Sequence, residues 1–111
     1  MATVKKALAV LNDSIEIDIP SDKLSITGLQ LIAGFVGQVV LEGTILGGSD
    51  YFVIALNPSG GGAAVLITPT PAVAGANGWW AETRGYEKVR ARVSVAGAGG
   101  MVGLTNNISG I

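Results

Sequence analysis

Apolar and polar residues alternate along most of this chain. The clearest run covers residues 86–95, where valine and alanine at every second position alternate with lysine, arginine and serine. Because successive side chains of a strand point to opposite faces, this run predicts a strand with one buried face and one hydrated, cationic face. A glycine-rich stretch at 97–100 and an apolar run at 101–104 follow it, so we expect these two runs to pair as a hairpin.

The same alternation, interrupted by glycine, proline and polar turns, predicts further strands. They cover residues 15–19, 24–32, 35–46, 51–56, 63–68 and 79–83. The pair Gly47 and Gly48 permits the positive φ angles of a tight turn, so a second hairpin is expected around it. No segment has a helical stripe, and strands recur at intervals of roughly 8 to 12 residues. The chain is therefore predicted to be all-β, a single antiparallel β-sandwich of jelly-roll-like type.

The length of 111 residues suits one domain. We assign residues 12–111 to the β-sandwich domain and residues 1–11 to an N-terminal arm, which either reaches a neighbouring molecule or forms an ordinary edge strand. Lys5 and Lys6 precede a short apolar stretch that faintly resembles a signal peptide, but this stretch is too short and lacks a cleavage site. We therefore expect synthesis in the cytoplasm.

The composition predicts that part of the surface of this chain is buried against other chains. Hydrophobic residues make up 49% and charged residues only 14% of it, about half the usual charged share. So weakly charged a surface suits a homo-oligomer or a docked subunit. The net charge of −1 gives no field toward nucleic acid. No apolar run approaches the ~20 residues of a membrane span, so neither nucleic acid nor a membrane is an expected partner.

Few residues of this chain suit catalysis. It has no histidine and no cysteine, which removes the commonest general base, the thiol nucleophile and the usual zinc ligands. Glu16 and Asp18 share a strand face and could form a carboxylate pair, but solvated outward positions explain them better. We expect no enzymatic activity, no metal and no cofactor.

Trp79 and Trp80 are candidate interface residues. As neighbours on a strand they must face opposite sides, so one enters the core and the other points outward. An outward tryptophan can stack on a sugar or pack into a subunit interface. With no second aromatic residue nearby in the sequence, the interface is favoured and the glycan is the alternative.

Arg84, Lys88, Arg90 and Arg92 form the strongest polar feature and are also candidate interface residues. Acidic residues beside them and the absence of interleaved aromatics argue against a phosphate-binding platform. Pairing with carboxylates, within the subunit or across an interface, is more natural.

Two segments carry a resemblance to small virion proteins of tailed bacteriophages and their prophages. Residues 40–52 are similar to the hairpin of that family that contains valine-glutamate-glycine-serine, and residues 85–93 resemble its glycine-tyrosine-x-lysine-valine-arginine strand. Both occur in the family's order. The resemblance implies a compact β-sandwich used as a capsid decoration, head-fibre or tail-fibre module, often trimeric.

A complete fibre needs a long shaft or repeats, and none is present. The resemblance therefore favours a capsid decoration (cement) protein, located in the virion, that binds the major capsid protein or another virion protein. The alternative is a head-fibre or tail-tip module that binds a glycan or receptor. In either case the N-terminal arm is a candidate for strand addition to a neighbour.

Overall fold

The computed structural model describes residues 2–6, 10–19, 24–32, 35–45, 50–68, 77–96 and 100–109. All regular secondary structure in these ranges is β. The strands are β1 (Ala2–Lys6), β2 (Ser14–Asp18), β3 (Leu24–Ile32), β4 (Gln38–Thr44), β5 (Phe52–Ile54), β6 (Asn57–Pro58), β7 (Gly78–Glu82), β8 (Lys88–Val95) and β9 (Met101–Ser109). Within this part of the chain, no helix has the length and apolarity needed to cross a membrane.

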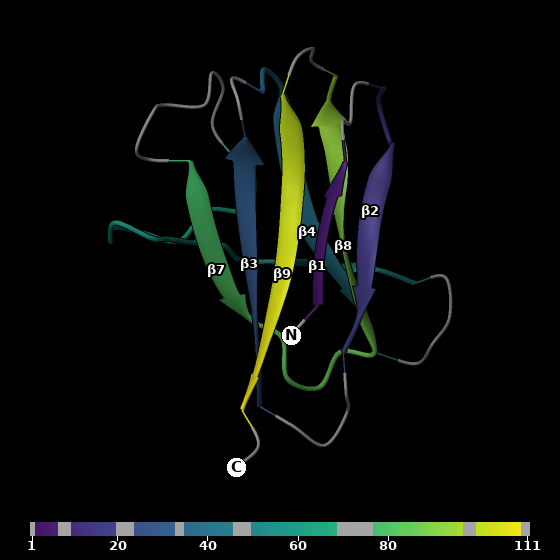
Figure 1. Cartoon of the computed structure of the whole chain (residues 1–111), viewed down its shortest axis with the longest axis vertical. Coiled ribbons are helices and arrows are strands. Elements are labelled where there is room, and N and C mark those ends of the chain that lie inside the picture. The colour runs from purple at the N-terminus through teal and green to yellow at the C-terminus, as the bar shows by residue number, and fades with distance from the viewer. Residues whose placement is uncertain are drawn as a thin grey trace.

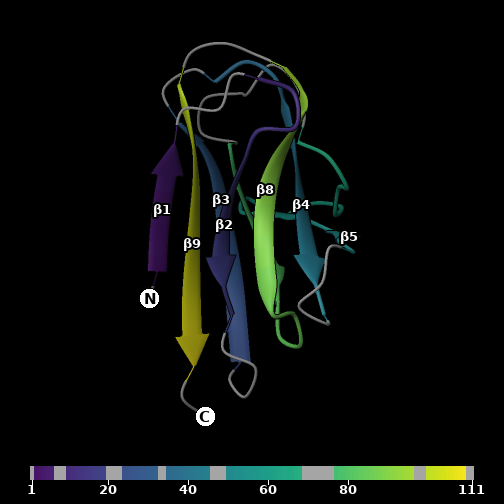
Figure 2. The same cartoon turned by 90° about the vertical axis from the view of Figure 1, so that its right-hand side faces the viewer.

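The strands form two antiparallel sheets packed face to face (Figures 1 and 2), which confirms the predicted β-sandwich. One sheet has five strands in the order β1-β9-β3-β7-β6, and the other has four in the order β2-β8-β4-β5. From β1 to β4, and again from β7 to β9, each strand lies in the sheet opposite to the one before it. This winding is that of a jelly roll with β6 as an added short edge strand.

The predicted C-terminal hairpin is wrong. Strand β8 pairs with β2 and β4, whereas β9 pairs with β1 and β3 in the other sheet. Both edges of each strand are therefore occupied, and the connection between them crosses from one layer to the other. Alternation identified the buried face of each strand correctly. It does not show whether the next strand pairs beside it in the same sheet or packs against it from the opposite sheet.

The hairpin predicted around Gly47 and Gly48 is confirmed in its strands, because β4 and β5 pair antiparallel; the two glycines themselves lie outside the described residues. The strand predicted at 63–68 is wrong. Only Val65 forms a bridge, to Leu56, and Leu66 and Ile67 are exposed. Only Val65 and Thr68 of this segment pack inward, and Thr68 is held by hydrogen bonds to Val39 rather than by a strand ladder.

The N-terminal residues contribute an edge strand. β1 pairs antiparallel with β9, from Ala2 opposite Asn106 to Lys6 opposite Val102. The sequence left two alternatives for this segment, an arm that reaches a neighbouring molecule and an ordinary edge strand, and within the molecule it forms an edge strand. Its other edge pairs with no described strand.

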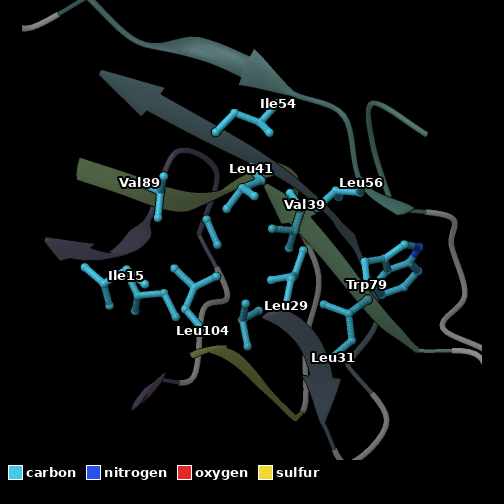
Figure 3. Packing of buried hydrophobic residues seen from close by; sticks show 14 of the residues in the cluster. Ile15, Leu29, Leu31, Val39, Leu41, Ile54, Leu56, Trp79, Val89 and Leu104 are labelled. Carbon is cyan, nitrogen blue, oxygen red and sulfur yellow. The ribbon is translucent and has the colours of Figure 1, made fainter. Parts of the chain in front are cut away.

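The core lies between the sheets and is almost entirely aliphatic (Figure 3). Leu29 and Leu31 of β3 meet Val39 and Leu41 of β4 across the sandwich, with Trp79 at one side. In β3 and β7 every second residue is buried, as the alternation predicted, whereas in β4 all residues from 39 to 44 are buried. Burial of an aliphatic side chain of this size contributes roughly 1.5 to 3 kcal/mol.

Four inward positions are polar rather than apolar. Ser25 and Thr27 of β3 hydrogen bond to the Thr83 hydroxyl at 2.8 and 2.9 Å, and the Asn106 side-chain amide donates to the Ser25 hydroxyl. All four residues are at most 1% exposed. Mutual hydrogen bonding lets these groups occupy the interior without the full cost of desolvation.

Candidate functional site: two outer faces and one end of the sandwich

The structure does not bring the six candidate interface residues together. Trp79 is 4% exposed and belongs to the core, whereas Trp80 is 43% exposed on the outer face of the five-stranded sheet. Arg84 is exposed between β7 and β8. Lys88, Arg90 and Arg92 line the outer face of the four-stranded sheet, on the opposite side of the molecule. The prediction of one inward and one outward tryptophan is thus confirmed.

Glu42 organises the outer face of the four-stranded sheet. It lies directly opposite Arg90 in the β4–β8 ladder and diagonally from Arg92. Arg90 Nε donates to Glu42 Oε1 at 2.9 Å, Arg92 Nε donates to the same oxygen at 3.0 Å, and Arg92 Nη2 donates to Oε2 at 3.2 Å. One carboxylate therefore holds two guanidinium groups in fixed orientations.

The surroundings of Glu42 favour the ionised form of its carboxyl group. Burial of its carboxyl group by itself raises the pKa, but the hydrogen bonds from Arg92 and Arg90 and their positive charges outweigh this and hold the pKa below its usual value. The same hydrogen bond to Glu42 raises the pKa of Arg92. Glu42 and Arg92 therefore stay ionised at neutral pH.

We call the outer face of the four-stranded sheet the charged face. Its other charged side chains also have partners within the chain. The Arg90 guanidinium lies over the Tyr51 ring, 3.7 Å from its centroid, and the Tyr51 hydroxyl donates to Glu16 at 3.4 Å. Lys88 pairs with Asp18 at 3.8 Å. The pairing of the cationic strand with carboxylates is therefore confirmed, and it occurs within the chain.

The two segments that carry the family resemblance contact each other. They include the adjacent strands β4 and β8, so Glu42 of the first segment binds the arginines of the second. Beside it, Gly43 lies under the Tyr86 ring, where a Cβ atom would approach Tyr86 Cδ1 to 2.3 Å. The glutamate of the first segment therefore binds the arginines of the second, and the glycine of the first makes room for the tyrosine of the second.

The outer face of the five-stranded sheet, which we call the neutral face, is different. It has a shallow groove of about 410 Å³ over β3, β7 and β9, and no charged residue is among the described residues that line it. Gly28, Gly78 and Gly103 supply its floor. Trp80 is not among the described residues that line the groove but lies opposite Gly28 in the ladder. In the sequence the only sign of the groove is glycine at outward strand positions, which looks the same as glycine in a turn.

One end of the sandwich carries exposed aliphatic side chains. β1, β3 and β8 end there, and β2, β4, β7 and β9 begin there (Figure 1). Val10, Leu11, Val36 and Val95 are 44 to 67% exposed, and we call them the uncharged end. Asn12 N donates to Val93 O, and Gln38 pairs with Val95, so these residues share one corner.

The sequence explains why this end carries little charge. The segments 7–13, 33–37, 69–77 and 96–100 at this end contain a single charged residue, Asp13, and Lys6 ends β1 beside them. The segments at the opposite end contain Asp22, Lys23, Asp50, Arg84 and Glu87. Low charge is therefore concentrated at one end rather than spread over the surface.

Glu16 and Asp18 occupy the solvated outward strand positions that the sequence favoured over a catalytic carboxylate pair. Glu16 and Asp18 are exposed and lie opposite Arg90 and Lys88 in the β2–β8 ladder. Among the described residues, no group of three or more acidic side chains is placed to hold a metal ion.

Neither a family model nor a curated protein matches this sequence. Among solved structures, the chain is similar to the SPBc2 prophage-derived protein YomS, with a TM-score of 0.61 and 12% identity over 96% of each chain. It is also similar to the Drosophila NLP-core, with a TM-score of 0.46 and 15% identity over 96% of this chain and 99% of that one. At 12% identity, the likeness to YomS shows a shared fold.

Proposed function

We propose that this chain is a structural protein of a bacteriophage or prophage particle, and specifically a capsid decoration (cement) protein without enzymatic activity. The observation that carries the proposal is the uncharged end, where Val10, Leu11, Val36 and Val95 are exposed together. The shared fold with a prophage-derived protein over 96% of both chains supports the phage setting.

In this proposal the uncharged end docks on the major capsid protein or on sister copies. Transfer of one exposed valine or leucine fully out of water contributes about 1.5 to 3 kcal/mol, so a few such contacts suffice when repeated over a shell. A ligand that binds the assembled shell but not its separated subunits stabilises the shell by mass action. The unpaired edge of β1 offers a second contact by strand addition.

A head-fibre or tail-tip module that binds a glycan receptor is the second candidate. The exposed indole of Trp80 beside an uncharged groove is the observation that favours it. The two candidates use different surfaces, so variants of one surface separate them.

The test begins with particles isolated from bacteria that carry the encoding genome. We expect mass spectrometry to find the chain in purified particles, and purified chain to rebind particles stripped of it. Val36→Asp and Val95→Asp should abolish rebinding, because each buries a charge at the docking contact. Ile45→Asp is the matched control, since Ile45 is 52% and Val36 51% exposed, and Ile45 lies at the end of β4 away from Val36.

Two outcomes contradict the proposal: the chain is absent from purified particles, or Val36→Asp and Ile45→Asp rebind equally well. The solution mass of the purified chain tests the associated proposal of a homo-oligomer, for which a trimer is favoured. A monomeric mass at all concentrations would rule that part out.

A further inference from the structure

We propose that the groove on the neutral face binds a neutral sugar ring stacked against Trp80. This inference deepens the second candidate function and rests on it, and it uses different residues from the docking contact of the first. The groove lies over the five-stranded sheet, whereas the docking contact proposed above lies at the uncharged end.

The groove exists because glycines alternate with larger residues across three neighbouring strands. In one rung of the ladder Gly28 lies between Thr105 and Trp80, and in the next Gln30 lies between Gly103 and Gly78. Each glycine lacks the side chain that would otherwise stand on this face. Trp80, which points outward, lies opposite Gly28 across the ladder and two residues from Gly78 along β7, and both of these glycines line the groove.

Polar side chains surround the groove. The Thr105 methyl group lies 3.0 Å from the place where a Cβ of Gly28 would be, and the Ser59 hydroxyl lies 3.2 Å from the corresponding place at Gly78. The Asn77 side-chain amide donates to the Leu31 carbonyl, which fixes it at the rim. Gln30 is exposed in the middle.

These groups match the chemistry of a sugar. Amide and hydroxyl side chains both donate and accept hydrogen bonds, as the hydroxyl groups of a sugar require. The C–H face of a pyranose ring is apolar and suits the flat surface of an indole. A volume of about 410 Å³ is at the small end of ligand sites, which favours one or two sugar rings over a larger ligand.

The charge of the site selects among sugars. The described lining of the groove has no cation, and the nearby Glu82 is exposed on the same face as Trp80. Lys5 lies opposite Gly103 in the β1–β9 ladder, so one residue of each sign stands beside the groove and an anionic sugar or a phosphate would find no net attraction there. The same argument disfavours single-stranded nucleic acid, which needs cations beside its stacking platform.

The test is a titration of the purified full chain with neutral oligosaccharides of glucose, galactose and N-acetylglucosamine, and with a sialylated oligosaccharide. Calorimetry gives the affinity, and tryptophan fluorescence reports directly on the indole. We expect at least one neutral oligosaccharide to bind and the sialylated one to bind more weakly. Trp80→Ala should weaken binding about tenfold or more, and Gln30→Ala less.

Phe52→Ala is the matched control, because Phe52 is an equally exposed aromatic residue, 53% against 43%, on the other sheet. It should leave the sugar affinity unchanged. Trp80→Phe keeps a stacking surface and leaves buried Trp79 as the sole tryptophan, so it should retain part of the affinity and lose the change in tryptophan fluorescence.

Two results would overturn the inference: no oligosaccharide binds the wild-type chain, or Trp80→Ala and Phe52→Ala bind a sugar equally well. A protein partner seated on the groove would give the first result. Val36→Asp distinguishes this inference from the docking proposal, since it should bind sugar normally while failing to rebind particles.

Discussion

The charged face and the neutral face lie on opposite sides of one core, yet their polar residues have different uses. On the charged face, Arg90 and Arg92 are held by Glu42, and Lys88 is paired with Asp18. On the neutral face, Gln30 and Trp80 border an open groove. The conspicuous arginine strand thus stabilises the fold, while the inconspicuous uncharged surfaces remain available to partners.

The two tryptophans give the largest expected contrast in stability. Trp79→Ala should lower the free energy of unfolding by about 3 to 5 kcal/mol, because it leaves a large cavity in the core. Trp80→Ala should change it by less than about 1 kcal/mol, since its indole is partly solvated. Denaturant unfolding of both variants measures the difference. Equal losses would mean that Trp80 also belongs to the packing of the molecule.

Removal of the charge of Glu42 should come next. Glu42→Gln leaves two half-buried guanidinium groups without their carboxylate, and we expect a loss of roughly 2 to 4 kcal/mol. Glu16→Gln is the control, because Glu16 is exposed on the same face and surface pairs contribute little. If both variants lost the same small amount, the charged face would not be held by Glu42.

Two glycines sharpen the contrast further. Gly43→Ala forces a Cβ atom into the Tyr86 ring at 2.3 Å and should cost about 1 to 3 kcal/mol. Gly28→Ala meets only the Thr105 methyl group at 3.0 Å, so we expect a loss below about 1 kcal/mol. Thermal unfolding of the two variants side by side checks this. Because Gly43 points to the core side of β4, as Leu41 does, a larger loss for Gly28→Ala would show that the neutral face is more tightly packed than the space under Tyr86.

The smallest effect should be the dependence of stability on pH. Because the pKa of Glu42 is lower in the folded chain than in the unfolded chain, ionised Glu42 stabilises the fold above its unfolded pKa. This contribution is lost as the pH falls through the folded pKa. Unfolding at a series of pH values between about 6 and 2 should show the loss, and Glu42→Gln should show less of it. An identical acid profile in both chains would contradict the assignment.

Alternation predicted the faces of the strands but not their neighbours. Residues 15–19, 24–32, 79–83 and 86–95 each have the buried side that the pattern indicated. Alternation contains no information on whether a strand pairs beside the next one or packs across from it, which is why the hairpin of β8 and β9 was wrong.

The candidate sites were harder to predict because their parts are distant in sequence. That Arg90 and Arg92 need a carboxylate followed from their charge, but Glu42 is 48 and 50 residues away and lies within an otherwise apolar run. The buried cluster around Thr83 was not predicted, since its partners Ser25 and Thr27 come from another strand more than 50 residues away. Glycine at outward positions, which makes the groove, looks the same in sequence as glycine in a turn.

Salt dependence of rebinding to stripped particles tests most directly whether the uncharged end, rather than the arginine strand, contacts the partner. Charge pairs at a solvated contact weaken as the Debye length falls from about 10 Å at 0.1 M to about 3 Å at 1 M salt. We predict that rebinding of the wild-type chain stays as strong, or strengthens, over this range, because apolar contacts are not screened. A progressive loss of rebinding with added salt would contradict the account.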